Sequence, residues 1–417
     1  MKFLMTLAWK NLSRYRKRTI ITASAIAFGL MIFVIMDSML LGIEIDSERN
    51  LINYETGSAQ ITRPEYEKER IILPLKYTID DPDAVMKELA ESKIPATPRI
   101  QFRGEIFMTE DPWETDGSMF ITGMAVDLDS VDSVFDFRRH VVEGEWLVPG
   151  DDGIVLGSWL AEDIGAKVGY PLSIRTRSKQ GANVVFFTTV KGIIKVPNPV
   201  VNRTTLFMDR DLADYSLEMD GSVTEIDLAF PWNEDPEKLV AKAKQSLNGN
   251  FGDLAISSWK SIASDYVAMA AAKRSGTSTI LLLVFIIAAV GISNTMLMAV
   301  FERTRELGMM RSLGMKDSQV RLAFLFEAGG IGLIGGTLGV IFGALANLPI
   351  AKYGIDYSIF MRHMDMGYRI LGILYGTWNP RTFIIAFLGG VIMAMIAAFI
   401  PTRRALKMEI TACLRDE

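Results

Sequence analysis

The side chains that most often carry chemistry are few and widely separated in this sequence of 417 residues. His140 and His363 stand alone, and Cys413 is the only cysteine. There is no H-E-x-x-H pair or cysteine cluster to hold a metal, and no Gly-x-Ser-x-Gly turn to present a nucleophile. There is also no Gly-x-x-x-x-Gly-Lys-Ser/Thr loop for nucleotide phosphates. The sequence therefore predicts no catalytic residue, no metal site, no directly bound cofactor and no ATPase.

A different kind of site is indicated by the charged segment at residues 302–321, which lies between two long apolar runs. A short helix is predicted there, in which Leu307, Met310 and Leu313 form an apolar strip between basic side chains. A solvated linker does not need these side chains, so we expect the segment to dock on a partner protein. An amphipathic linker lying on the lipid surface is the alternative. The candidate docking residues are Glu302, Arg303, Arg305, Glu306, Leu307, Met310, Arg311 and Gly314.

The elements that must position this segment are four apolar runs, each near the ~20 residues that cross a hydrocarbon core. They predict an α-helical membrane protein with four transmembrane helices and a large mixed α/β domain between the first and second. The predicted order is an amphipathic helix at 1–19, spans at 20–43, 273–301 and 322–348, the α/β domain at 44–272, the short helix at 302–321, a loop at 349–381, and a last span and tail at 382–417.

The charge distribution predicts the orientation of these spans. Residues 1–19, 302–321 and 401–417 together hold 15 basic and 6 acidic side chains, against 44 and 49 in the whole chain. Lys and Arg accumulate on the cytoplasmic side of spans. Both termini and the short helix are therefore expected in the cytoplasm, in a multi-pass protein of the bacterial inner membrane, with 44–272 and 349–381 outside.

Local patterns within 44–272 predict both strands and helices. Runs rich in β-branched and aromatic residues predict strands at 57–63, 120–126, 154–156, 172–175, 184–194 and 206–208. Helices are predicted at 81–92, 158–165 and 234–247, the last capped by Asn233 or Asp235.

Glycines in the third span recur at four-residue intervals. This spacing places them on helix faces that a neighbouring helix can approach closely. The predicted packing residues are Gly332, Gly335, Gly336, Gly339 and Gly343.

Several motifs in the sequence resemble the FtsX-like permease superfamily. They are Trp9-Lys10-Asn11-Leu12, Asn294-Thr295-Met296, the stretch 302–315, Phe326-Glu327-Ala328 with the glycine-rich run after it, and 401–406 followed by Leu414-Arg415. The resemblance implies that 302–321 couples the chain to a separate cytoplasmic ABC ATPase dimer, which binds ATP and Mg. It also implies a second permease subunit, either the same chain or a paralogue, and membrane lipid; no nucleic acid is expected as a partner.

Within this superfamily the region outside the membrane looks most like the lipoprotein-releasing (Lol) permeases. The stretches 123–127, 142–146, 153–157 and 164–169 follow the order of that group. This implies extraction of lipoproteins and release to a periplasmic carrier. Some Lol subunits extend a long hook that captures the carrier, whereas here only 175–182 precedes the return strand. The alternatives are MacB-like export of peptides, macrolides or lipids, and FtsX-like regulation of cell-wall hydrolases.

The Lol resemblance also places acyl chains or another amphiphilic substrate beside the first span. Apolar side chains recur there at three- or four-residue spacing, and methionine adapts to chains of variable shape. An ionisable side chain near the end of a span should face protein, water or headgroups. The simpler interpretation is lipid-facing or packing side chains. The candidate cavity residues are Phe28, Ile32, Ile35, Met36, Asp37 and Met39.

Overall fold

The computed structural model describes residues 2–107, 118–232, 234–247, 251–357 and 367–407. In this part of the chain, four helices are long and apolar enough to cross a membrane, within Thr19–Thr56, Ser264–Glu302, Asp317–Tyr353 and Pro380–Arg404. A mixed α/β domain lies between the first and the second of these helices. The predicted fold class is thereby confirmed. His363, Cys413 and the Leu414-Arg415 ending lie outside the described residues.

The chain divides into two compact units, each described here by itself. The first, which we call the helical unit, consists of Met1–Glu44, Ala270–Tyr357 and Ile373–Glu417. The second, the α/β unit, consists of Ile45–Met269 and Ser358–Gly372. The loop predicted at 349–381 is thus shared between the two units.

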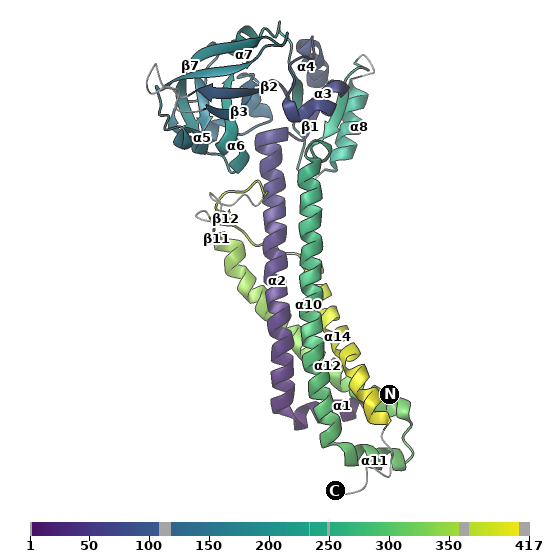
Figure 1. Ribbon diagram of the computed structural model, residues 1–417. Helices are drawn as coiled ribbons and strands as arrows, with labels where there is room; N and C mark the ends of the chain where they lie inside the picture. The colour runs from purple at the N-terminus through teal and green to yellow at the C-terminus, as the bar shows by residue number, and fades with distance from the viewer. Residues whose placement is uncertain (1, 108–117, 233, 248–250, 358–366, 408–417) are drawn as a thin grey trace. The chain divides into compact units, whose positions relative to one another are not determined.

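The helical unit is built from long helices, with the short helix α11 between α10 and α12 (Figure 1). Its helices are α1 (Lys2–Arg14), α2 (Arg16–Leu51), α10 (Ser264–Glu302), α11 (Thr304–Ser312), α12 (Asp317–Tyr353) and α14 (Pro380–Leu406), and its short strands are β11 (Ile355–Asp356) and β12 (Ile373–Leu374). Helix α2 extends beyond the predicted span 20–43, and α10 begins before 273. Polar residues outside a bilayer can continue a helix without adding to its apolar run, so hydropathy does not mark these ends.

The glycines of α12 lie where other helices approach its backbone. A Cβ on Gly335 would come within 2.8 Å of the Ala23 carbonyl oxygen, and one on Gly339 within 2.8 Å of Leu30 Cβ, so this row faces α2. A Cβ on Gly332 would lie 2.9 Å from Ala394 Cβ in α14. Gly343 continues the first row and Gly336 the second. Two faces of one helix therefore accept two neighbours, because neither row carries a side chain.

The α/β unit has one ten-stranded sheet in the order β10-β1-β9-β2-β3-β8-β5-β7-β4, with β6 pairing to β2 and β7. Helices α3, α4 and α8 gather around the β1 end of the sheet (Figure 1). The strands are β1 (Ala59–Thr62), β2 (Ala96–Phe107), β3 (Ser118–Val126), β4 (Val141–Gly144), β5 (Ile154–Gly157), β6 (Pro171–Arg177), β7 (Asn183–Ile194), β8 (Thr205–Asp209), β9 (Glu225–Leu228) and β10 (Ala255–Ser258). The helices are α3 (Pro64–Glu69), α4 (Pro82–Glu91), α5 (Ser158–Asp163), α6 (Pro199–Thr204), α7 (Arg210–Leu217), α8 (Pro236–Ser246) and α9 (Trp259–Ile262).

Each strand predicted from the sequence overlaps a strand of the sheet, but β2, β4, β9 and β10 were not predicted. The three predicted helices correspond to α4, α5 and α8. Helix α8 is capped by the Asp235 side chain, which accepts a hydrogen bond from the Glu237 N–H, with Pro236 in the first turn. Strands β6 and β7 pair from Pro171–Thr189 to Arg177–Asn183, so only the short turn at 178–182 joins them.

One short segment from the second half of the chain, 367–372, belongs to the α/β unit and is held by Arg369. Its backbone N–H donates to Ser47 Oγ at 2.7 Å, and its carbonyl accepts from Asn50 Nδ2 at 2.8 Å. Its guanidinium Nε donates to Glu55 Oε2 at 3.2 Å. Backbone and side chain of one residue thus join this segment to the C-terminal end of α2 and the turn after it.

Candidate coupling site

Helix α11, in the segment predicted to dock on a partner, lies between the apolar helices α10 and α12. It follows Arg303, whose backbone leaves the helical region, and ends at Ser312, with Leu313 as the C-cap. Gly314 comes next with φ 93°, a conformation that side chains disfavour, and this glycine lets the chain turn back toward α12.

The apolar strip of α11 is divided between the inside of the protein and its surface. Leu307 is buried in a cluster with Val300, Val320 and Phe324, against which Met310 also packs. The ends of α10 and α12 therefore cover Leu307 and partly cover Met310, and a coupling role for these two residues stays a prediction.

Two apolar side chains near the end of α11 face outward, Leu313 of the strip and Met309 outside it. Met309 is 46% exposed and Leu313 is 87% exposed. Burying a side chain of this size typically gains about 1.5–3 kcal/mol. These two residues are thus apolar surface that a partner protein could cover.

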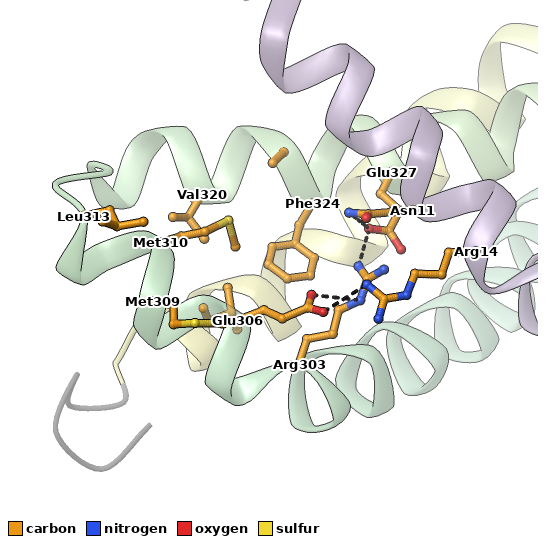
Figure 2. Close-up of a pocket in the computed structure, with 12 residues that line it drawn as sticks. Asn11, Arg14, Arg303, Glu306, Met309, Met310, Leu313, Val320, Phe324 and Glu327 are labelled. Carbon is orange, nitrogen blue, oxygen red and sulfur yellow. Dashed lines mark hydrogen bonds and ion pairs between the residues drawn. The ribbon is translucent and has the colours of Figure 1, made fainter. Parts of the chain in front are cut away.

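Beneath α11 lies a buried ion pair that sequence spacing did not predict. Arg303 Nη1 donates to Glu327 Oε2 at 3.0 Å, and both side chains are almost completely buried. Asn11 Nδ2 of α1 donates to the same oxygen at 3.3 Å. One carboxylate therefore joins α1, the N-terminus of α11 and α12, and Figure 2 shows the three side chains converging on this point.

The Arg303 guanidinium has N–H donors that its ion pair with Glu327 does not use. Its Nε and Nη2 are buried without a hydrogen-bond acceptor in the described part of the chain. The guanidinium lies over the Tyr15 ring at 4.3 Å, and Nε is 3.8 Å from Glu306 Oε2. Burial alone would lower the pKa of Arg303, but Glu327 and Tyr15 raise it. Arg303 is therefore a permanent cation with unused hydrogen-bond donors.

A pocket of about 360 Å³ opens beside this cation. Its lining combines the buried ion pair with the apolar strip of α11 (Figure 2): Asn11, Arg14, Arg303, Glu306, Leu307, Met309, Met310, Leu313, Val320, Ala323, Phe324 and Glu327. The structure brings together Arg303, Glu306, Leu307 and Met310 of the predicted docking residues. Apolar walls with a buried cation suit a partner side chain that is apolar and carries an acceptor.

The remaining charges of the segment are nearer the surface. Arg14 Nη1 is 3.1 Å from Glu306 Oε1, and Arg311 Nε is 3.2 Å from Asp317 Oδ1. Glu302 lines a second cavity, on the side of α2. The predicted residue Arg305 is outside both cavities.

The residues predicted to line an acyl-chain cavity lie along α2. Phe28 is 61% exposed, and Ile32, Ile35, Met36, Asp37 and Met39 are half-buried. The Asp37 carboxylate accepts hydrogen bonds from Thr382 Oγ1 and from Asn379 Nδ2, which join α2 to the start of α14. Asp37 thus has partners within this chain, and the acyl-chain role stays a prediction.

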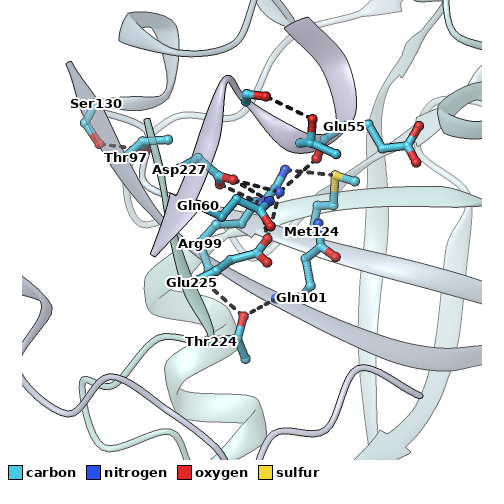
Figure 3. Close-up of polar contacts among 12 residues, drawn as sticks. Glu55, Gln60, Thr97, Arg99, Gln101, Met124, Ser130, Thr224, Glu225 and Asp227 are labelled. Carbon is cyan, nitrogen blue, oxygen red and sulfur yellow. Dashed lines mark hydrogen bonds and ion pairs between the residues drawn. The ribbon is translucent and has the colours of Figure 1, made fainter. Parts of the chain in front are cut away.

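A second buried charge cluster lies in the α/β unit around Arg99, and we call it the Arg99 cluster (Figure 3). Arg99 Nη2 is 2.7 Å from Glu225 Oε1, and Nε is 2.9 Å from Asp227 Oδ2. Nη2 also donates to the Glu55 carbonyl at 2.9 Å, and Gln60 Nε2 donates to Asp227 Oδ1 at 2.7 Å.

The Arg99 cluster holds two acids and one fully buried base. Burial raises the pKa of Asp227 to about 8, although Arg99 beside it acts in the opposite direction. The cluster connects β1, β2 and β9 to the turn that follows α2, and no described cavity opens onto Arg99. Its arrangement supports the fold rather than binding of a ligand.

His140 also has a local role in the α/β unit. Its Nε2 lies 2.8 Å from the Tyr54 hydroxyl, and burial lowers the pKa of this imidazole. In the part of the chain that the structure describes, no group of three or more His, Cys, Asp or Glu side chains could hold a metal.

Comparison with known proteins places the C-terminal part of the chain in a family. Residues 278–410 match the model of the FtsX-like permease C-terminal domain. An uncharacterized ABC transporter permease, MJ1507 of Methanocaldococcus jannaschii, is 24% identical over 429 residues, which cover 99% of this chain and 98% of that protein.

Two other relatives are similar over shorter stretches. The ABC transporter permease YtrF of Bacillus subtilis is 34% identical over 141 residues, 32% of this chain and 30% of YtrF. The macrolide export ATP-binding/permease protein MacB of Escherichia coli is 26% identical over 235 residues, 55% of this chain and 33% of MacB. The chain thus spans about a third of the length of YtrF and of MacB.

Proposed function

We propose that this chain, whose residues 278–410 form an FtsX-like permease domain, is the membrane subunit of an ATP-binding-cassette transporter. In this proposal α11 lies in the cytoplasm and receives the motion of a separate ATPase dimer, which binds ATP and Mg. The spans pass that motion to the α/β unit outside the cell membrane. A second permease subunit, identical or paralogous, completes the complex.

The observation that carries the proposal is the construction of α11. One side of it is fixed to the ends of α10 and α12 by Leu307 and by the buried Arg303–Glu327 pair. The other side presents Met309 and Leu313 to a partner beside a pocket of about 360 Å³. A helix anchored this firmly moves its supporting spans when a partner pushes on it, because packed interiors deform little.

We further propose that the substrate is a lipoprotein taken from the outer leaflet. The support is the order of motifs in the α/β unit that resemble Lol permeases. The tight turn between β6 and β7 leaves no hook for a carrier, so carrier binding would fall to the second permease subunit. Export of macrolides, peptides or lipids is the second candidate, favoured by the similarity to MacB over 55% of this chain.

Photo-crosslinking tests the position of the ATPase. With a benzophenone amino acid at Leu313, we expect a crosslink to the ATPase in the purified complex, and a changed yield when ATP is trapped. The matched control is Leu333, an exposed residue in the apolar part of α12, which should crosslink lipid alone. An ATPase that copurifies but crosslinks equally at Leu333, or at neither position, contradicts docking on α11.

Cysteine labelling tests the orientation. A cysteine at Met310 and one at Gly181 should react with an impermeant reagent from opposite sides of the membrane. Labelling of both positions in intact cells would contradict the four-span topology.

A further inference from the structure

A second cavity in the helical unit is not used by the coupling site. It has a volume of about 840 Å³ and lies between the turn that joins α1 to α2, the first turns of α2 and the last turns of α10. Its lining has basic groups at one end, and both apolar and uncharged polar groups toward the other: Ser13, Arg14, Tyr15, Arg16, Lys17, Ile21, Thr22, Asn294, Thr295, Met298 and Glu302.

The basic end has two cations that no carboxylate neutralises in the described part of the chain. Arg16 donates through Nε to the Ser13 carbonyl at 3.1 Å, which leaves its Nη donors available. Lys17 has no ion pair among the described residues, and both side chains are exposed. Arg14, in contrast, is already paired with Glu306. Glu302 is the single acidic residue of the lining.

The deep end of the cavity has a polar group that needs a partner. Asn294 is exposed in α10 and, within the described part of the chain, its amide makes no hydrogen bond. It lies eight residues before the end of α10 at Glu302, or about 12 Å along the helix axis. At that depth an amide without a partner is costly in hydrocarbon, where water does not compensate it.

The wall beside Asn294 is apolar and open. Ile21 is 71% exposed and Met298 is 63% exposed. Behind them, Thr22 Oγ1 donates to Thr295 Oγ1 at 3.3 Å, and Thr295 Oγ1 donates to the Gly291 carbonyl at 2.7 Å, so these hydroxyls are satisfied. Along the spans, the cavity therefore presents the cations first, then the apolar side chains of Ile21 and Met298, and the Asn294 amide at its deep end.

We infer that this cavity binds a phospholipid with an anionic headgroup. The phosphate pairs with Arg16 and Lys17, and the acyl chains run inward along Ile21 and Met298. Guanidinium and ammonium groups bind phosphate strongly, and basic pockets between spans suit anionic lipids. The inference rests on the proposed membrane function, but not on the identity of the transported substrate.

Lipid binding is measurable on the purified full-length chain without ATPase or substrate. In detergent, added phosphatidylglycerol should raise the unfolding temperature by roughly 3–5 °C at saturation. Phosphatidylcholine should raise it less, and glycerol 3-phosphate, which has the phosphate but no acyl chains, should leave it unchanged. Equal stabilisation by the two lipids, or full stabilisation by glycerol 3-phosphate, would overturn the inference.

Variants locate the binding in the cavity. Arg16→Gln/Lys17→Gln should remove the preference for phosphatidylglycerol. The matched control is Lys10→Gln/Arg404→Gln, which neutralises two exposed cations of the same unit outside the cavity and should keep the preference. If the control variant loses the preference for phosphatidylglycerol, or if Arg16→Gln/Lys17→Gln keeps it, the preference arises from general surface charge and not from the cavity.

A variant that keeps the charge tests the same site independently, in case Arg16→Gln/Lys17→Gln does not fold. Ile21→Trp fills the apolar end and should reduce the phosphatidylglycerol that copurifies in native mass spectrometry at least fivefold. Unchanged copurified lipid would contradict the site. Loss of this lipid from the wild-type chain on assembly with its ATPase would assign the cavity to the protein partner instead.

Discussion

Two arginines are buried among the side chains that the structure describes, Arg99 in the α/β unit and Arg303 in the helical unit, and their surroundings differ. Arg99 has two carboxylates, a backbone carbonyl and the face of Phe135 around its guanidinium. Arg303 has one buried carboxylate, and two of its nitrogens lack a hydrogen-bond acceptor beside a pocket. A buried charge with all its donors used stabilises a fold, whereas unused donors at an opening suit a partner.

The largest expected effect comes from Arg99→Met. It leaves Glu225 and Asp227 buried without their cation, and breaking a buried ion pair typically costs about 3–5 kcal/mol. We expect the α/β unit to unfold at a lower temperature and to become sensitive to trypsin. Arg103→Met is the control, because Arg103 is on the same strand and exposed. Equal stability of the two variants would show that Arg99 is not a structural residue.

A smaller effect on stability is expected for Glu327→Gln. The amide oxygen still accepts from Arg303, so the cost should be about 1–3 kcal/mol. The loss should appear in function, as a roughly tenfold lower stimulation of the ATPase by the permease in the purified complex. Glu44→Gln is the control, because its partly exposed pair with Arg274 lies in the same unit outside the coupling pocket and contributes only about 0–1 kcal/mol.

If Glu327→Gln and Glu44→Gln keep equal ATPase stimulation, the contrast between the two arginines fails. Arg303 would then be a structural residue like Arg99.

The smallest effect concerns the pH dependence of stability. The pKa of Asp227 is raised to about 8 in the folded protein, whereas an unfolded aspartate titrates near about 3.9. The folded state therefore binds the proton more tightly, and the stability that this proton contributes is lost as pH rises through about 8. Between pH 7 and 8 the wild-type chain should lose roughly 2–4 °C in unfolding temperature on this account.

Asp227→Asn should flatten this pH dependence, because the amide does not titrate. Asp129→Asn, at an exposed position of the same unit, should leave it unchanged. The opposite slope, with the wild-type chain more stable at pH 9 than at pH 6, would mean that Asp227 is ionised throughout.

The sequence predicted the four spans well because a bilayer requires a long apolar run. It failed at β2, where Pro98, Arg99 and Glu105 resemble a polar loop. The first five residues of β2 are buried on both faces, so no alternation of apolar and polar residues marks the strand. Arg99 was missed for the same reason, since a buried arginine is recognisable only from its partners on other strands.

The coupling site was predicted in part. The apolar and charged residues of α11 are contiguous in the sequence, so their docking role could be proposed from it. The Arg303–Glu327–Asn11 contacts join residues 24 and 316 positions apart, and no spacing rule relates them. Which half of the apolar strip faces outward depends on the ends of α10 and α12, and therefore on tertiary packing.

The contribution of 367–372 to the α/β unit has a practical consequence for domain exchange. A fragment cut at Ile45 and Met269 contains all ten strands of the sheet but lacks Arg369. Ser47 and Asn50 would lose a backbone partner, and Glu55 would lose its guanidinium. Transplanting this unit between permeases therefore requires two gene segments, Ile45–Met269 and Ser358–Gly372. A transplant of the first segment alone leaves polar groups at the end of α2 without their hydrogen-bond partners.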